Sequence, residues 1–184
     1  VKDVAWTAMD PPLRETMLAR GDIDAITGFS FTSLLNLEAR GVKTEDIVVL
    51  PYAQYGVKLY GNVIIAGEDF LKKNPEAVKA FLRAFTKGVK DVIADPKAGV
   101  ATVKERDGIV NADLELRRLK LALDQTVLTP DAKAEGFGDV NAARLALMAS
   151  QVSDAFATKE RVVATAVWNA GFLPSVTDRA IFKK

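Results

Sequence analysis

The chain has 184 residues, of which 49% are hydrophobic and 27% are charged, and this balance is ordinary for a globular protein. Its 25 basic and 24 acidic residues leave a net charge of +1, so there is no broad electrostatic footprint for nucleic acid or an anionic membrane. The sequence contains neither histidine nor cysteine, which excludes thiolate metal sites, disulfides, cysteine nucleophiles and acid–base chemistry by histidine.

The first third of the chain alternates strand candidates with helix candidates. Strands are predicted over residues 1–9, 22–27 and 47–50, and a longer one over residues 57–66. Helices are predicted after Asp10, where two prolines suit a first turn, and from Ser30 to about Arg40, with Gly21 and Gly41 ending the two helices. Strand and helix alternating at this spacing indicate a parallel sheet, so residues 1–66 are predicted to be α/β.

The remainder of the chain, residues 67–184, is predicted to be almost entirely helical. Asn74-Pro75 is a typical helix start, and it opens an amphipathic stripe of Val78, Phe81, Leu82, Phe85, Val89, Val92 and Ile93. Three further helix starts are predicted at Asp95-Pro96, Asn111 and Thr129-Pro130. The apolar faces of helices must be buried. The few strands predicted in residues 1–66 are too small a sheet to cover this number of helices, so we expect further strands that lie outside this chain.

Two segments resemble motifs of a known protein family. Residues 13–26, LRETMLARGDIDAI, are similar to the A-L-x-x-G-x-(V/I)-D-A segment of periplasmic binding proteins of the nitrate, taurine and sulfonate type. Residues 69–82, DFLKKNPEAVKAFL, are similar to the F-x-x-x-(N/H)-P-E-x-V-x-x-F-(L/V) segment of the same proteins. From the order and spacing of these segments, the chain is identified as a member of this family, which is also described as NMT1/THI5-like.

The resemblance implies an α/β fold of the type II periplasmic binding proteins, in which two lobes joined by hinge strands close on a ligand. Residues 1–55 are then expected to be the remainder of the second lobe, and residues 56–66 a hinge crossover strand. Residues 67–184 are expected to return to the first lobe and to form an extended helical C-terminal half. The family's beginning has no counterpart in this sequence, so we expect a C-terminal fragment that self-associates through exposed apolar surface.

The resemblance also implies a function, that of a periplasmic, extracytoplasmic solute-binding component of an ABC importer. Such a protein captures a small solute, such as a sulfonate, taurine or nitrate, and delivers it to a permease in the inner membrane. No enzyme activity, cofactor, metal or nucleic-acid partner is expected. Two other classes share the fold: enzymes similar to thiamine-pyrimidine synthases, which use histidine and cysteine, and the effector-sensing domains of LysR-type regulators, which are smaller and less helical.

The first candidate ligand site is the turn formed by Gly28, Phe29, Ser30 and Phe31, which follows a predicted strand and opens a helix. Helix N-termini present backbone N–H groups to anions, so this turn suits a sulfonate, carboxylate or nitrate, with Phe29 or Phe31 lining a cleft. The alternative is that Ser30 simply caps the helix and that the two phenylalanines belong to the core.

Three other candidates carry polar side chains elsewhere in the chain. Asp10 ends the first predicted strand, where it faces an amine or hydroxyl of a ligand or acts as an ordinary N-cap. Tyr55 and Asn62, with Tyr60 between them, suit a small-molecule cleft, the alternative being packing within a pair of strands. Arg14 has the chemistry to clamp an anion, but its place in a helix favours a solvated role.

Overall fold

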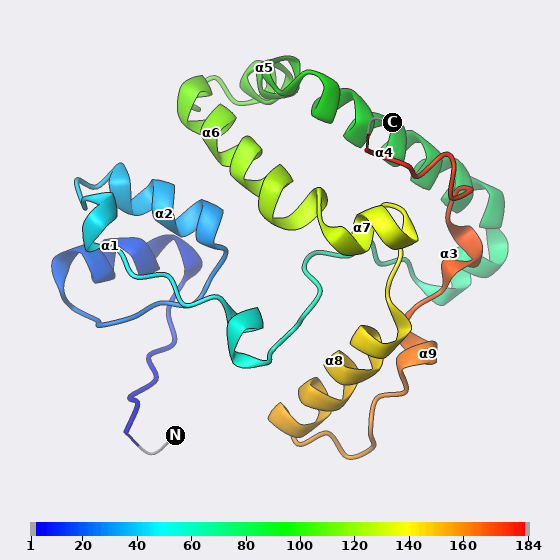
Figure 1. Cartoon of the computed structure of the whole chain (residues 1–184), viewed down its shortest axis with the longest axis horizontal. Coiled ribbons are helices and arrows are strands. Elements are labelled where there is room, and N and C mark those ends of the chain that lie inside the picture. The colour runs from blue at the N-terminus through cyan, green and yellow to red at the C-terminus, as the bar shows by residue number, and fades with distance from the viewer. Residues whose placement is uncertain (1–2, 183–184) are drawn as a thin grey trace. The chain divides into compact units, whose positions relative to one another are not determined.

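The computed structural model describes residues 3–182, and within that range the chain consists of helices and irregular segments without any β-strand (Figure 1). Labels beginning with η mark 3₁₀ helices, apart from η4, which is a short π-helix. In chain order the elements are η1 (Pro11–Leu13), α1 (Arg14–Arg20), α2 (Ser30–Glu38), η2 (Thr44–Asp46), η3 (Tyr52–Tyr55), α3 (Glu68–Lys73), α4 (Pro75–Ala94), α5 (Pro96–Arg106), α6 (Ala112–Ala122), η4 (Leu123–Val127), α7 (Pro130–Glu135), α8 (Ala142–Ala155), α9 (Ala164–Val167) and η5 (Ala170–Phe172).

The predicted α/β fold is therefore wrong for the described residues. Residues 22–27 and 57–66 are irregular, as are residues 47–50 and the described part of 1–9, while residues 1–2 lie outside the described range. A strand forms only when a neighbouring strand accepts and donates hydrogen bonds along its main chain, and these segments have no such neighbour in the range 3–182. High β-propensity alone does not make a strand.

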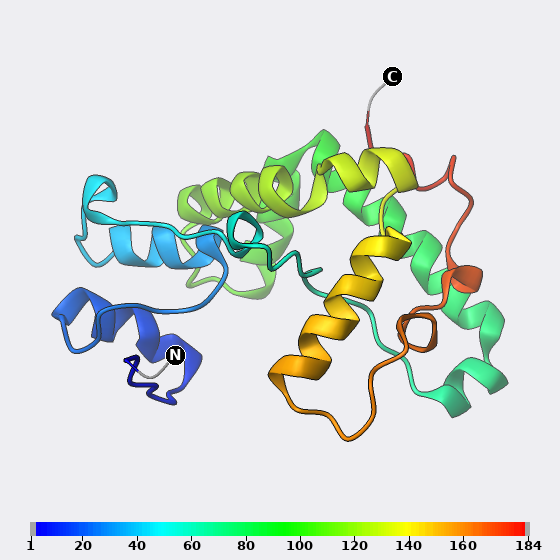
Figure 2. The same ribbon diagram turned by 60° about the horizontal axis from the view of Figure 1, so that its bottom comes forward.

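The chain divides into two compact units between Leu50 and Pro51. In the first unit, α1 and α2 lie one above the other (Figures 1 and 2). Helix α1 ends where Gly21 adopts the left-handed conformation at φ 76°, so the predicted helix end is confirmed. Leu35 and Leu37 of α2 are almost fully buried and supply the apolar core of this small unit.

The predicted helix starts of the second unit are confirmed, and local side-chain caps account for three of them, the exception being α4, whose Asn74 makes no side-chain cap. Helix α4 begins at Pro75, and α5 begins at Pro96 with Asp95 accepting a hydrogen bond from the N–H of Ala98 at 3.0 Å. Asn111 caps α6 and Thr129 caps α7 in the same manner. These interactions span three residues or fewer, which is why the sequence alone reveals them.

The second unit packs its helices pairwise, with α5 contacting both α4 and α6 (Figure 1). Its buried apolar side chains include Val100, Leu123, Leu145, Ala149 and Ile181. The apolar stripe predicted for α4 is buried only in part, because Phe81 and Phe85 are 55% and 44% exposed. These two rings stack on each other, and Phe85 also stacks on Phe137 at a centroid distance of 6.4 Å.

A buried arginine fastens the C-terminal segment to the loop that follows α7. Arg179 is 4% exposed; its Nε donates to the carbonyl of Pro174 and its Nη1 to the carbonyl of Glu135. Its Nη2 pairs with Asp139 Oδ2 at 3.0 Å. A Cβ on Gly136 would lie 3.0 Å from Arg179 Nη1, so the arginine side chain occupies space that a larger residue at position 136 would need.

No helix in the described range combines the length and the apolar character that a membrane crossing demands.

Candidate functional site

The turn Gly28–Phe31 lies at the N-terminus of α2, with Phe29 at the N-cap and Ser30 as the first helical residue. Phe29 offers no side-chain cap, but its carbonyl oxygen accepts hydrogen bonds from the N–H groups of Thr32 and Ser33, both at 3.0 Å. The Phe29 and Phe31 rings stack at a centroid distance of 5.3 Å and an interplanar angle of 22°. Phe29 is 46% exposed, so this ring pair lies at the surface of the unit.

Arg14, in the first turn of α1, bridges the two candidate segments of the first unit. Its Nε donates to the carbonyl oxygen of Pro11 at 3.2 Å, and its Nη1 donates to that of Thr27 at 2.6 Å. Pro11 follows Asp10, and Thr27 precedes Gly28. The Arg14 guanidinium therefore connects the main chain next to Asp10 with the main chain next to the Gly28–Phe31 turn. The expected solvated role of Arg14 is wrong, because the side chain is half-buried and its Nη2 alone has no partner among the described residues.

Gly28 allows this close approach because it has no side chain. A Cβ at this position would lie 3.3 Å from Arg14 Nη1 and 3.2 Å from Ser33 Oγ. Both distances are tighter than ordinary van der Waals contacts, so any larger residue displaces the guanidinium or the hydroxyl. The absence of a side chain at Gly28 therefore lets the main chain of the turn pack directly against the guanidinium of Arg14.

Glu15 is a buried carboxylate that the sequence analysis missed. It is 2% exposed, and Ser33 Oγ of α2 donates a hydrogen bond to Glu15 Oε1 at 2.8 Å. A signal was present in the spacing, since Glu15 precedes Leu18 by three residues and shares its helix face. The contact joins α1 to the first turn of α2, so this hydrogen bond holds together the two helices that frame the turn.

Asp10 occupies the N-cap position of η1, with extended backbone at φ −66° and ψ 137°. Its carbonyl oxygen accepts a hydrogen bond from the N–H of Leu13 at 2.9 Å, but its side chain makes no cap hydrogen bond. The carboxylate is exposed. Asp10 is thus a cap by position only, and its side chain is available to a ligand.

The other two predicted residues, Tyr55 and Asn62, belong to the second unit. Tyr55 ends η3 and is 66% exposed, and Asn62 is exposed in the irregular segment that follows. The residues between them, 56–60, are largely irregular, and side chains of α8 bind part of their main chain. We call residues 56–60 the tethered segment.

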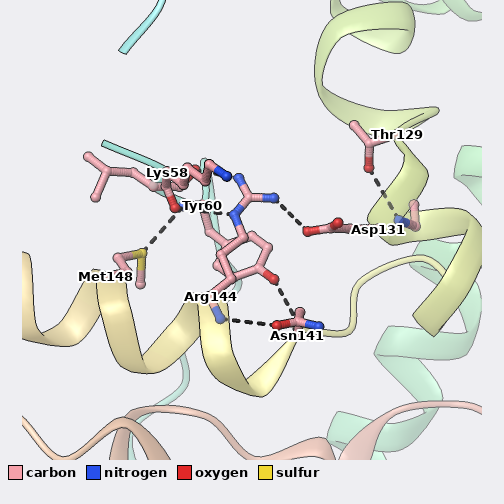
Figure 3. Close-up of polar contacts among 9 residues, drawn as sticks. Lys58, Tyr60, Thr129, Asp131, Asn141, Arg144 and Met148 are labelled. Atoms are coloured by element: carbon pink, nitrogen blue, oxygen red, sulfur yellow. Dashed lines mark hydrogen bonds and ion pairs between the residues drawn. The ribbon is translucent and has the colours of Figure 1, made fainter. Parts of the chain in front are cut away.

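Arg144 of α8 makes three contacts to the tethered segment (Figure 3). Its Nη2 donates to the carbonyl oxygen of Leu59 at 2.8 Å and its Nε to that of Lys58 at 3.2 Å. Its Nη1 pairs with Asp131 Oδ2 at 2.6 Å. The guanidinium also lies 4.2 Å from the centroid of the Tyr60 ring, in cation–π geometry.

Three further contacts extend the same interaction along α8. Gln151 Nε2 donates to the carbonyl oxygen of Gly56 at 3.0 Å, and the N–H of Tyr60 donates to Met148 Sδ at 3.3 Å. The N–H of Asn141, at the cap of α8, donates to the Tyr60 hydroxyl oxygen at 2.8 Å (Figure 3). Asn141, Arg144, Met148 and Gln151 recur at helical spacing, which is the sequence signal that these residues share a face.

The arrangement of the first unit suits the binding of a small solute. A half-buried guanidinium and a helix N-terminus favour an anionic group, and the adjacent ring pair offers an apolar surface. Within the described range, no three or more acidic side chains gather in a way that could hold a metal ion.

Comparison with known proteins assigns a family. A family model described as NMT1/THI5 like matches residues 3–99, just over half of the chain. The matched stretch includes Asp10, the Gly28–Phe31 turn, Tyr55 and Asn62. A search of curated proteins and a search of solved structures each found no match.

Proposed function

Because the chain belongs to the NMT1/THI5-like family, we propose that it is the solute-binding component of an ABC importer. In this proposal the protein works in the periplasm, binds a small solute without making or breaking a covalent bond, and passes the solute to a permease in the inner membrane. Binding rather than catalysis is supported by the composition, since the chain has no histidine and no cysteine to serve as base or nucleophile.

The observation that carries the proposal is the meeting of Arg14 with the Gly28–Phe31 turn. Arg14 uses Nε and Nη1 on the carbonyls of Pro11 and Thr27, which fixes the orientation of its guanidinium. Nη2 then remains for an anionic oxygen beside the first turn of α2. A cation held rigidly in this way binds an anion at a lower entropic cost than a mobile surface arginine does.

The ring pair narrows the class of solute. A nitrate ion uses the guanidinium and the helix N-terminus but leaves Phe29 and Phe31 without a partner. An alkanesulfonate or an aromatic carboxylate places its anionic group at Arg14 and its apolar body against the rings. We therefore propose an organic anion, a sulfonate or carboxylate, as the solute, with Asp10 able to accept a hydrogen bond from an amine or hydroxyl of the same molecule.

Tyr55 and Asn62, in the second unit, are proposed as ligand contacts in their own right. Both side chains are exposed, and both offer a hydrogen-bonding group to a polar solute. Their role is tested separately from that of Arg14, by single substitutions to Phe and Ala respectively.

Isothermal titration calorimetry tests the proposal, with a panel of taurine, alkanesulfonates, aromatic carboxylates, nitrate and pyrimidines. We expect one organic anion to bind wild-type protein and to lose affinity by about tenfold or more in Arg14→Gln, since hydrogen bonds to charged groups contribute ~1.5–3 kcal/mol. Arg20→Gln is the matched control, because Arg20 is exposed at the far end of the same helix.

Two outcomes would contradict the proposal. The first is turnover of any panel member by the wild-type protein, which would indicate an enzyme of the same family. The second is solute binding that is equally strong in Arg14→Gln and in wild type, which would place the site elsewhere in the chain. Thermal melts of the same samples provide a second readout, since ligand at about 100 times its Kd adds roughly 2.7 kcal/mol of stability.

A further inference from the structure

An open hollow of about 190 Å³ lies between α4 and the C-terminal segment, and the proposed function does not use it. All of its lining belongs to the second unit. Helix α4 supplies one wall, and the C-terminal segment, red in Figure 1, supplies the other. The lining residues are Lys90, Ile93, Ala94, Ala180, Ile181 and Phe182. Five of these side chains are apolar, so among the described residues Lys90 is the one charged group of the lining.

Both walls of the hollow are held in place by the packing of the second unit. The first wall is part of α4, a helix of 20 residues. The second wall directly follows Arg179, whose guanidinium donates to three main-chain carbonyls and pairs with Asp139. Ile181, in the middle of this wall, is only 6% exposed. Because the walls are already ordered, a ligand that enters the hollow loses little free energy to their ordering.

Lys90 is half-buried at the hollow and has no hydrogen bond or ion pair with any described residue. The other two lysines of α4 are paired, Lys79 with Glu76 at 2.9 Å and Lys87 with Asp91 at 2.7 Å. The residues three and four places from Lys90 on α4 carry no acidic group, so the helix offers it no partner. Its ammonium group is therefore a partly desolvated charge without a counter-ion beside an apolar surface.

We propose that this hollow is a second binding site, which takes a small monocarboxylate with an aromatic body. A cavity of about 150 Å³ accommodates benzene, so a hollow of about 190 Å³ has room for one such ring. The ring packs against the apolar walls, where Phe182 offers an aromatic partner, and the carboxylate pairs with Lys90. The inference goes beyond the proposed function and does not depend on it, because Arg14 belongs to the first unit.

NMR of isoleucine methyl groups tests the proposal, because Ile93 and Ile181 both line the hollow and report binding at that place. The whole chain, labelled with ¹³C in its isoleucine methyl groups, is titrated with sodium benzoate at constant pH and ionic strength. We expect saturable shifts of both methyl signals with a Kd on the order of 1 mM, because the hollow is open and the ligand is small. Ile109, which is 94% exposed in the loop between α5 and α6, is the internal control and should not move.

Substitutions at the hollow test the roles of the charge and of the space. Lys90→Met keeps the aliphatic stem but removes the charge, and we expect the Kd for benzoate to rise about tenfold. Lys90→Arg keeps the charge and should recover most of the affinity. Ala94→Leu fills part of the hollow from an exposed position of α4 and should abolish the shifts. Lys79→Met is the matched control, since Lys79 pairs with Glu76 on the same helix and should not affect benzoate binding.

Two further probes separate the ring from the charge. Benzyl alcohol has the ring without the carboxylate, and acetate has the carboxylate without the ring, so we expect each to bind about tenfold more weakly than benzoate. If benzyl alcohol shifts the Ile93 and Ile181 methyls as readily as benzoate does, or if Lys90→Met binds benzoate as wild type does, the carboxylate site is overturned.

The remaining outcomes distinguish this hollow from the proposed site at Arg14. The second site is overturned if neither Ile93 nor Ile181 shifts saturably through about 20 mM benzoate, which is roughly twentyfold above the expected Kd. It is also overturned if benzoate binding is lost in Arg14→Gln and kept in Lys90→Met, because benzoate then binds in the first unit. Benzoate shifts that are weakened by Lys90→Met and unchanged by Arg14→Gln support the hollow, even where no solute of the panel binds at Arg14 and the proposed function fails.

Discussion

Arg14 Nη1 and the carbonyl oxygen of Thr27 are 2.6 Å apart, and this contact ties the start of α1 to the residue just before the candidate turn. The neighbouring residue Glu15 makes the second tie, to Ser33 in the first turn of α2. Two consecutive residues of one helix thus hold the turn from both sides. The candidate turn is consequently fixed by contacts with α1 and α2, and it is an integral part of the first unit.

Replacing Arg14 by methionine is expected to destabilise the first unit by about 2 kcal/mol, because two main-chain carbonyls lose a charged donor. Methionine keeps much of the aliphatic volume, so the loss reports the hydrogen bonds rather than a cavity. Urea denaturation followed by circular dichroism measures the change. Arg20→Met, at the exposed end of α1, should change stability by less than about 0.5 kcal/mol, and equal losses for the two variants would refute the structural role of Arg14.

Substitution of Gly28 by alanine tests the close approach of the turn to Arg14. The added Cβ would meet Ser33 Oγ at 3.2 Å and Arg14 Nη1 at 3.3 Å, so we expect a loss of about 1 kcal/mol and weaker solute binding. Gly108→Ala is the control, since a Cβ there meets nothing within 4 Å. Differential scanning calorimetry should show a lower Tm only for Gly28→Ala. A Gly28→Ala variant as stable as the Gly108 control would mean that Arg14 adapts freely.

Breaking the buried ion pair of Arg179 should be far more costly than breaking an exposed one. Arg179→Met leaves Asp139 without its cation and the carbonyls of Pro174 and Glu135 without a donor, and we expect a loss of about 3 kcal/mol. Arg161→Met removes the pair with Asp154, whose side chains are 67% and 62% exposed, and should cost less than about 1 kcal/mol. Chemical denaturation of the two variants gives the comparison, and similar losses would contradict the assigned burial.

The carboxylate of Glu76 should titrate below its ordinary range. Lys79 Nζ donates to Glu76 Oε1 at 2.9 Å, and this hydrogen bond, the charge of Lys79 and that of Arg83 lower the pKa of Glu76 from its ordinary value of 4.5. A lowered pKa in the folded state means that the stabilisation is present above pH 4.5 and is lost as the pH falls through the folded-state pKa.

An NMR titration of the Glu76 side chain measures this pKa directly. We expect Lys79→Met to move the pKa of Glu76 upward, toward 4.5, because the variant removes both the hydrogen bond and the charge that lower it. Lys87→Met is a suitable control, since Lys87 pairs with Asp91 on the same helix. An unchanged pKa in Lys79→Met would show that the pair does not persist in solution.

Local sequence patterns determined the helices and the family of this protein. Asn74-Pro75, Asp95-Pro96 and Asn111 begin helices in the structure as predicted. Asp95 and Asn111 accept hydrogen bonds from N–H groups within three residues of them, whereas Asn74 makes no side-chain cap and Pro75 supplies the local signal. Gly21 ends α1 for a similarly local reason. The family resemblance read from residues 13–26 and 69–82 agrees with the family model, which spans both segments.

Only the tertiary structure decided whether the apolar segments form strands and which groups the arginine side chains contact. The predicted strand at 57–66 needed a neighbouring strand, and instead Arg144, 86 residues from Lys58, binds part of its main chain. The role of Arg14 depends on Thr27, which lies 13 residues away and across a turn. The hydrogen bonds and caps of a helix depend on residues that are close together in the sequence. The pairing of strands and the contacts of long side chains depend on which distant groups folding brings together.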